Sequence, residues 1–423
     1  MSAWSRFATI GSMYMAQTFA TAFVSHLMPA IYRDQGLPLE RFWILSVALI
    51  PFWFRWAWAP LVDRNTHGPF GPRKSWFLPC TALGVLTYVG LSLVDPTIEQ
   101  IWWLMAVFGL QALVVSTQEV AVDAYMVDNI APGERGAGSG VKTYMEAVAE
   151  VMALAGLAFV YDRYGWDAAV SVAAALFVFF FIPALVRREK PLHAAARTER
   201  SAAKPSVARF LRRRDSYVII ALLAAGGIAQ GMYFPMMGAF LVDAGLAVTE
   251  VGAVLGVVVV IGMFIGATVA MTAVNRLGTK LTVALLAMAA FPAFVPAVYI
   301  ATQESLGLVP IILGMSIPTS VLALMYVVFV VARLSWTSTL QAGTDYSIQS
   351  AIFRGGATAA VGVGGLLAAW LGWIGFFVAY AAIVVAVLLV FFVVSDPLDR
   401  LVARRVEREQ SLARTGRPAD TGL

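Results

Sequence analysis

The sequence contains few charged residues, few histidines and almost no cysteine. Charged residues make up 13% of its 423 residues, against about 25% in soluble domains, and there are three histidines and one cysteine. The single cysteine, Cys80, excludes an internal disulfide and is expected to be a small apolar core residue. The sequence has no His/Cys cluster with metal-ligand spacing, no nucleophile elbow and no phosphate-binding glycine loop. These absences argue against an enzyme, against a bound metal or cofactor, and against transport driven by ATP.

Apolar residues dominate the chain instead. They make up 60% of it, and the mean hydropathy is +0.78. Apolar runs of about 20 residues, the length that crosses roughly 30 Å of hydrocarbon as a helix, recur along the sequence. Twelve such runs predict an all-α integral membrane protein with spans at about 8–32, 42–62, 75–94, 101–122, 138–160, 167–186, 216–241, 250–272, 279–301, 308–333, 347–371 and 373–395.

The distribution of Lys and Arg predicts which ends of these spans face the cytoplasm. All Lys and Arg fall on one side, except Arg33, Arg41 and Arg163 on the other side and Arg55 inside the second span. Because cytoplasmic loops retain positive charge, both termini are predicted to be cytoplasmic. The basic balance follows from this asymmetry and from attraction to anionic lipid, so it gives no support to nucleic-acid binding. The first span is long and carries polar residues, so we expect it to stay in the protein rather than be cleaved as a signal.

The longest connection divides the chain into two halves. Residues 187–215 contain RREK and LRRRDS, which predicts a solvated basic linker on the cytoplasmic side. The expected domains are a six-helix bundle at 1–186, this linker, a second six-helix bundle at 216–395 and a cytoplasmic tail at 396–423. The linker is interpreted as a tether and topology signal, with binding of lipid or of a regulator as the alternative.

The two halves contain similar short segments in the same order, as expected of transporters built from internal repeats. Asp123 and Asp345 occupy matched positions in the third pair of segments. The pairs are DQGLPLERFWIL (34–45) with DAGLAVTEVGAVL (243–255), LVDRNTHGPFGPRK (61–74) with AVNRLGTK (273–280), and STQEVAVDAY (116–125) with STLQAGTDYS (338–347).

A charged loop joins the second and third spans. It reads WAPLVDRNTHGPFGPRK at 58–74, with Asp63 and Arg64 where the second span ends and Arg73 and Lys74 where the third begins. A carboxylate here can pair with arginine and accept hydrogen bonds from the N-terminus of a neighbouring helix. Charges that are paired only while the two halves are closed on the cytoplasmic side would act as a latch for that conformation.

Further charged residues near the cytoplasmic end of the fourth span are expected to complete this cytoplasmic latch. They are Glu119 and Asp123, with Arg135 beyond them, and Asp345 joins them by the repeat. Contact of Glu119 or Asp123 with substrate is the alternative interpretation.

The loop resembles the signature of the major facilitator superfamily, Gly-x-x-x-Asp-Arg-x-Gly-Arg-Arg/Lys. Ala59 replaces the first glycine, Asp63 and Arg64 match, and Arg73 and Lys74 supply the closing basic pair after an insertion. The resemblance implies a twelve-helix secondary transporter of the cytoplasmic (inner) membrane, with a cavity lined by helices 1, 4, 7 and 10.

Longer segments resemble one branch of that superfamily. RWAWAPLVDR followed by GPRKSW, and TQEVAVDAYMVDNIAPGERGAG (117–138), are similar to the anhydromuropeptide permeases (AmpG-type) and the acetyl-coenzyme A transporters. The similarity is dense over roughly 20–140 and diffuse beyond. Two features depart from the muropeptide permeases: the halves are joined only by a short basic linker, and QAGTDYSIQ (341–349) is more similar to the siderophore permeases of this branch.

The fifth span carries ionisable residues on one helix face. Lys142, Glu146 and Glu150 follow one another at intervals of four, so they share a face, and ionisable groups inside a membrane mark pathways or proton relays. At about 1.5 Å per residue, Glu146 lies roughly 12 Å deep and Glu150 roughly 18 Å deep. We therefore expect Glu146 and Glu150 to take part in proton coupling. The alternative is an ion-pair ladder with Lys142, or Lys142 and Glu146 reaching cytoplasmic water.

Two arginines also lie within predicted spans. Arg55 is eight residues before Asp63 in the second span, and Arg354 is some ten residues into the eleventh. A fixed cation in the cavity could bind a carboxylate or phosphate of the substrate. Pairing with a carboxylate of a neighbouring helix is the alternative for both arginines.

Hydroxyl and amide side chains line the predicted cavity helices. In the first span Gln17, Thr21 and Ser25 share a face, and His26 follows them. Such groups suit a sugar-, peptide- or catecholate-like solute, although Ser and Thr also bond helix backbones and an isolated His is often a structural donor. The corresponding residues on the other cavity helices are Gln111, Gln230, Tyr233, Ser316, Thr319 and Tyr326.

Together these features predict proton-coupled import of a bulky polar solute by rocking of two halves around a midplane site. A muropeptide is the expected substrate and a ferric siderophore the alternative, followed by an acyl-coenzyme A or a drug. A transporter-like sensor is the alternative class of protein. The expected partners are a small-molecule substrate, protons and membrane lipid, with the chain acting as a monomer.

Overall fold

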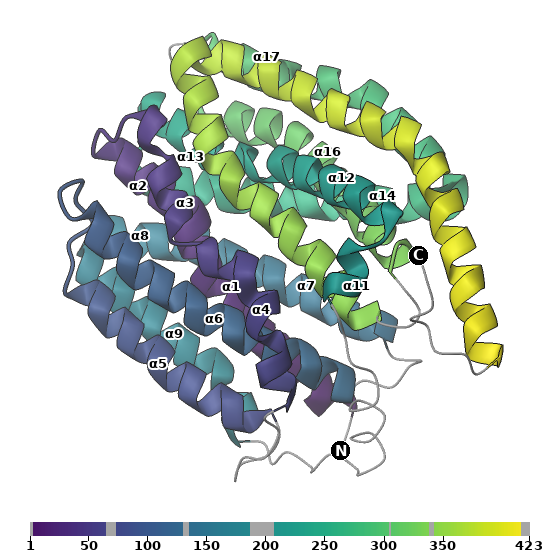
Figure 1. Ribbon diagram of the computed structural model, residues 1–423. Helices are drawn as coiled ribbons and strands as arrows, with labels where there is room; N and C mark the ends of the chain where they lie inside the picture. The colour runs from purple at the N-terminus through teal and green to yellow at the C-terminus, as the bar shows by residue number, and fades with distance from the viewer. Residues whose placement is uncertain are drawn as a thin grey trace.

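The protein is a bundle of long helices (Figure 1). The computed structural model describes residues 3–64, 73–129, 135–186, 207–303, 306–337 and 342–415, and these ranges contain helices and no strand. This is the all-α membrane architecture that the long apolar runs predict, because only a helix satisfies every backbone polar group within a single segment in lipid.

The helices before the linker include two π-helical turns, in the first and fifth predicted spans. A π turn is a rare irregularity that occurs mostly within α-helices. The elements are α1 (Ala3–Ala22), the π-helix η1 (Phe23–Leu27), α2 (Met28–Asp34), the 3-10 helix η2 (Leu39–Arg41), α3 (Trp43–Val47), α4 (Ile50–Arg64), α5 (Lys74–Ser92), α6 (Ile101–Asn129), α7 (Arg135–Val151), the π-helix η4 (Met152–Gly156), α8 (Leu157–Tyr164) and α9 (Trp166–Val186).

The helices after the linker include two that change direction at a single glycine. Gly278 (φ 77°) breaks α14 and Gly372 (φ 65°) breaks α17, backbone conformations that residues with a Cβ rarely adopt. In Figure 1, α17 turns back at the upper left, far from the two chain ends. The elements are α11 (Val207–Leu211), α12 (Arg214–Gly231), α13 (Tyr233–Asp243), α14 (Val248–Ala293), α15 (Val295–Ala301), α16 (Leu308–Ser335) and α17 (Ala342–Thr415).

The predicted spans coincide with helical segments. Among the described residues, nine helices are long and apolar enough to cross a membrane, and one of them, Asp345–Glu407, covers two predicted spans that Gly372 separates. The first predicted span covers α1, η1 and α2, and the second covers α3 and α4. A π segment interrupts the first span and a turn interrupts the second. The multi-pass membrane fold is thus confirmed, while the number of twelve spans stays a prediction.

The helices on each side of the linker pack mainly against one another. In the first set α1 packs on α7 and α9, and α5 packs on α6 and α9; in the second, α12 packs on α17 and α14 on α16. The two sets meet where α13 contacts α2, where α17 contacts η2, α3 and α4, and where α14 contacts α7, η4 and α8. Division into two bundles at the linker agrees with this packing and remains our interpretation.

Glycines allow the two sets of helices to approach closely. A Cβ placed on Gly365 of α17 would lie 2.1 Å from the carbonyl oxygen of Leu39, and one on Gly252 of α14 would lie 2.4 Å from that of Leu154. Small residues at such positions let backbones touch, which is how helices associate in lipid, where burial of apolar surface gives no net driving force. The two sets are therefore in backbone contact at the predicted periplasmic end.

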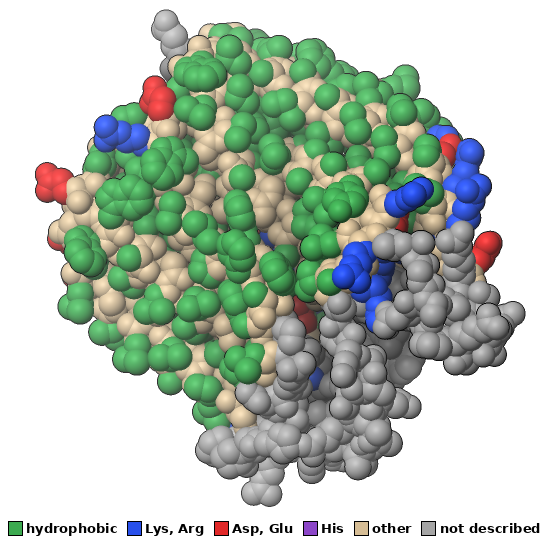
Figure 2. Space-filling view, in the orientation of Figure 1, with side chains coloured by type: hydrophobic (Ala, Val, Ile, Leu, Met, Phe, Trp, Pro, Cys, Tyr) green, Lys and Arg blue, Asp and Glu red, His purple; other side chains and the backbone are tan. Residues whose placement is uncertain are grey.

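The surface carries hydrophobic side chains over most of the face shown in Figure 2, and Lys and Arg gather at its right-hand side. Large apolar residues such as Trp103 (72% exposed) and Val393 (68% exposed) point outward. An apolar belt of this extent would aggregate in water and is explained by contact with lipid.

We predict that Gly365→Ala weakens the contact between the two sets of helices. The added methyl group would collide with the backbone of Leu39, and overpacking of this kind costs about 1–3 kcal/mol. The melting temperature in detergent should therefore fall. Gly109→Ala is the matched control, because its Cβ would meet Ala48 at an ordinary 4.0 Å; equal melting temperatures for the two variants would contradict the prediction.

Candidate functional site

A carboxylate shared by two arginines lies inside the helix bundle. Glu119 of α6 forms an ion pair with Arg55 of α4, with Nη1 2.7 Å from Oε2, and accepts a hydrogen bond from Arg354 of α17, with Nη2 2.9 Å from Oε1. The side chains of Glu119 and Arg55 are 8% and 9% exposed, whereas that of Arg354 is 42% exposed. Charges this deep must be paired, because an unpaired ion in a membrane interior is costly.

For Arg55 and Arg354 the sequence left open either binding of a substrate anion or pairing with a carboxylate of a neighbouring helix. Both Arg55 and Arg354 pair with a carboxylate, and the pair formed by Arg354 joins the helices before the linker to those after it. Because the Arg354 side chain is 42% exposed, its guanidinium can also donate to an anionic group in the space between the helices.

A second cluster lies around Lys142. Its Nζ is 3.8 Å from a carboxylate oxygen of Asp123 and 3.8 Å from one of Glu146, and it sits 4.3 Å from the ring centre of Tyr14. The Tyr14 hydroxyl donates to Asp123 over 2.6 Å. Lys142 and Glu146 thus form the first step of the ion-pair ladder that the spacing of four residues allows. Asp123, expected in the cytoplasmic latch, belongs to this cluster.

The third charged group, Glu150, does not continue that ladder. Its carboxylate oxygen lies 3.3 Å from Nε2 of His26, and the two side chains are 16% and 22% exposed. The fifth span therefore holds two carboxylates in different settings, Glu146 with a lysine and Glu150 with a histidine.

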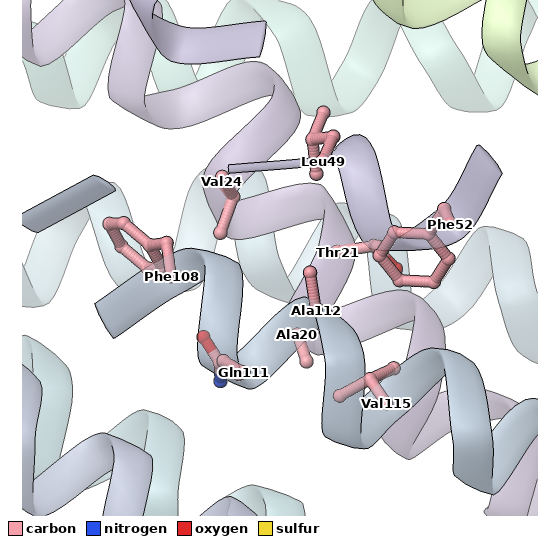
Figure 3. Close-up of a pocket in the computed structure, with 9 residues that line it drawn as sticks. All are labelled: Ala20, Thr21, Val24, Leu49, Phe52, Phe108, Gln111, Ala112 and Val115. Atoms are coloured by element: carbon pink, nitrogen blue, oxygen red, sulfur yellow. The ribbon is translucent and has the colours of Figure 1, made fainter. Parts of the chain in front are cut away.

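A small pocket lies between α1, α4 and α6 (Figure 3). Thr21 and Gln111 supply its polar groups, Phe52 and Phe108 are among its apolar walls, and its cavity volume is about 10 Å³. The Thr21 hydroxyl donates to the backbone carbonyl of Gln17, the alternative role foreseen for such residues. A pocket of this size holds about one water molecule, so it is a gap between helices rather than a preformed solute site.

Several buried amide groups on the predicted cavity helices have donors or acceptors that make no hydrogen bond within the described residues. Gln17 and Gln111 are 4% and 3% exposed, and within the described part of the chain neither amide has a hydrogen-bond partner; the same holds for the side-chain oxygen of Gln230. Buried polar groups are normally satisfied, so these amides are suited to binding a polar solute. Ser25 is half-buried in the π-helix η1, which directly follows the helix of Gln17.

The tyrosines expected in the cavity differ in their settings. Tyr233 is fully buried, stacks on Tyr380 with ring centres 5.8 Å apart, and its hydroxyl donates to the carbonyl oxygen of Met315. This environment is that of a packing residue. Tyr326 is 41% exposed and lies against Phe353 and Arg333, so it remains accessible from outside the packed core.

The cytoplasmic latch is described only in part. Arg73 precedes α5 and is 1% exposed, and Lys74 begins that helix. Asp345 is fully buried and pairs with Arg213 at the start of α12, within the second set of helices. The loop at 65–72 lies outside the described residues, and so do the side chains of Asp63, Arg64 and Arg135. The latch as a whole therefore stays a prediction.

An ion pair at the opposite end of the molecule was not foreseen. Arg33 of α2 donates to both carboxylate oxygens of Asp243 on α13, over 2.5 and 2.7 Å, and the Trp373 indole N–H donates to the same carboxylate over 2.9 Å. The group joins the two sets of helices. The signal was present in the sequence, because Arg33 directly precedes the repeated segment that begins DQGL and Asp243 is the first residue of the one that begins DAGL.

Comparison with known proteins places this arrangement in a family. The Major Facilitator Superfamily model matches residues 4–342. Over 237 residues the chain is 24% identical to the anhydromuropeptide permease of Escherichia coli (strain K12), covering 55% of this chain and 48% of that protein. The matched part thus spans about half the length of this curated relative.

Solved structures show the same fold at low sequence identity. The nucleoside transporter NupG superposes with a TM-score of 0.69 at 13% identity, covering 91% of this chain and 98% of that one. A D-xylose-proton symporter superposes with a TM-score of 0.68 at 15% identity, covering 92% and 96%. The resemblance carried by the charged loop is therefore confirmed: the chain is a membrane transporter rather than an enzyme, and it belongs to the Major Facilitator Superfamily.

Proposed function

We propose that this chain imports a bulky polar solute such as a muropeptide across the cytoplasmic membrane, driven by protons. It would do so as a monomer with both termini in the cytoplasm. The two bundles, residues 1–186 and 216–395, would rock around a site between them, with the basic linker as their tether. The observation that carries the proposal is the Glu119–Arg354 ion pair, which joins the two bundles.

The contacts at the two ends of the molecule support alternating access. At the predicted periplasmic end the bundles are joined by Arg33 and Asp243, and the Ser46 hydroxyl donates across to the carbonyl oxygen of Thr358. These contacts must break for solute to enter from the periplasm. Arg73, Lys74 and Asp123 lie toward the predicted cytoplasmic end, where the predicted latch would close in exchange.

The chemistry of the interior favours an anionic solute with amide or hydroxyl groups. Arg354 offers positive charge, and Gln17, Gln111 and Gln230 offer buried amides with hydrogen-bonding capacity. A muropeptide combines sugar hydroxyls, amides and carboxylates, which matches this set. Similarity to a protein named an anhydromuropeptide permease points the same way.

Protons are the proposed driving force because carboxylates lie within the fifth span. Glu146 and Glu150 are 29% and 16% exposed, deep in a helix that packs against the other bundle through α14. Ionisable groups in such places mark proton pathways. Their protonation would change the charge between the bundles and so favour one conformation over the other.

The test is uptake into proteoliposomes of a labelled anhydromuropeptide beside a ferric siderophore, each with and without an inward proton gradient. We expect gradient-dependent uptake of the muropeptide and not of the siderophore. Uptake of the siderophore alone would move the assignment to the related siderophore permeases. Binding of solute without uptake or counterflow exchange would indicate a sensor.

We predict that neutralising both carboxylates together, Glu146→Gln with Glu150→Gln, abolishes gradient-driven uptake. Glutamine keeps the shape and the hydrogen-bonding capacity but cannot bind and release a proton. The measurement is initial uptake with and without the gradient. Glu250→Gln, a carboxylate at the start of α14 that bonds the backbone N–H of Ala247, is the control. Intact gradient-driven uptake in the double variant would refute this role.

We predict that Arg354→Gln weakens transport of anionic solute specifically. Glu119 keeps Arg55 as its partner, so the fold should survive, while the loss of a charge-assisted hydrogen bond to substrate costs about 1.5–3 kcal/mol, roughly 10- to 100-fold in KM. Arg354→Lys should recover part of this loss. The comparison is with the same muropeptide carrying amidated carboxylates; an equal loss for both solutes would contradict binding of substrate carboxylate by Arg354.

A further inference from the structure

We infer that His26 and Glu150 together form the site that binds the transported proton. We also infer that contact of His26 with Phe234 makes proton binding at this site depend on the position of the other bundle. The inference rests on the proposed proton-coupled transport and assigns its proton to one of the two carboxylates. It starts from a coincidence of three features at one place: an ion pair, two π-helical turns and a contact between the bundles.

The pair is formed where both of its helices depart from α-helical geometry. His26 lies within the π-helix η1 (Phe23–Leu27), and Glu150 lies two residues before the π-helix η4 (Met152–Gly156). The two π segments pack against each other. Single π turns are rare and occur frequently at functional sites, because they re-aim side chains at the cost of regular hydrogen bonds. Two of them meeting at one ion pair indicate that this geometry is specifically built.

The pair also faces the second bundle. The ring centre of Phe234 on α13 lies 5.5 Å from that of His26 in an edge-to-face arrangement, and η1 packs against α13. Nδ1 of His26 is buried and has no hydrogen-bond partner within the described residues. The side of the imidazole away from Glu150 therefore meets an apolar surface supplied by the other bundle.

Few other charges act on the pair. Toward the predicted cytoplasmic end are Glu146 and Lys142 on α7, which pair with each other, and Tyr14 on α1. Toward the other end Arg33 pairs with Asp243. From α14, which packs along α7 and η4, no ionisable side chain comes between Glu250 and Arg276.

These surroundings make the charge of the pair depend on one proton. With the proton bound, the pair is neutral overall, either as imidazolium with carboxylate or as imidazole with carboxylic acid. Without it, neutral imidazole and carboxylate leave one uncompensated negative charge on the pair, whose imidazole packs against Phe234. An isolated buried charge is costly, so closure of the bundles over the site requires the proton.

This requirement gives the coupling a direction. When the bundles separate at the periplasmic end, α13 moves away from η1 and water reaches the pair, which then binds a proton. Closure against Phe234 is favoured only for the neutral pair, and opening at the opposite end releases the proton to the cytoplasm. Glu146 keeps Lys142 as its partner throughout this scheme and does not carry the transported proton.

The experiment separates coupling from transport itself. Purified wild type, Glu150→Gln, His26→Gln and Glu250→Gln are reconstituted, and two rates are measured: counterflow exchange of labelled anhydromuropeptide, which needs no net proton movement, and accumulation driven by an inward proton gradient. We expect Glu150→Gln to retain counterflow while its accumulation ratio falls to unity, because the amide preserves the contact with His26 but binds no proton. Retained counterflow also shows that the variant is folded.

The histidine variant tests the pH dependence of accumulation, which would not change if the pair were purely structural. His26→Gln removes one of the two groups that share the proton, so the pH dependence of accumulation should change. An unchanged pH profile would overturn the role of His26. Suppose that uptake by the wild type is driven by protons. If Glu150→Gln then accumulates solute as well as Glu250→Gln does, the inference is wrong while the proposed function stands. The same holds if Glu146→Gln alone is uncoupled. A wild type without gradient dependence would overturn both.

Discussion

The arrangement of the helices depends on the need to pair every charge that lies inside the membrane. Glu119 satisfies that need for Arg55 within one bundle and for Arg354 across to the other. Breaking such a pair by removing one partner leaves an uncompensated buried charge, which costs about 3–5 kcal/mol. The same charges that hold the bundles together are thus the ones that a substrate or a proton can rearrange, and this links the packing of the protein to its proposed transport cycle.

The helical architecture could be predicted from the sequence because it depends on segment length and apolarity alone. The charged segment around Asp63 and Arg64 was enough to recognise the family, and the fold agreed. Irregularities within helices were not predictable in this way. The π segments η1 and η4, and the reversals at Gly278 and Gly372 without any longer loop, depend on contacts between helices that hydropathy does not record.

The composition of the charged site was predictable, but its pairings were not. Spacing of four residues placed Lys142, Glu146 and Glu150 on one face, yet it could not show that Glu150 turns to His26. Spacing along one helix fixes neighbours on that helix only, whereas partners on other helices depend on helix rotation and tilt. For the same reason the sequence could not show that Glu119 pairs with arginines of two other helices, and its place in the cytoplasmic latch stays a prediction.

Alternating access is tested most directly by locking the periplasmic contact between Arg33 and Asp243. Arg33→Cys with Asp243→Cys, in a Cys80→Ser background, can be joined by a short, reducible cross-linker, with each single-cysteine variant as control. The account predicts that cross-linking stops uptake, that reduction restores it, and that the cross-linked protein in detergent still binds muropeptide from its open end. Continued uptake by fully cross-linked protein would contradict the rocking of two bundles around a shared site.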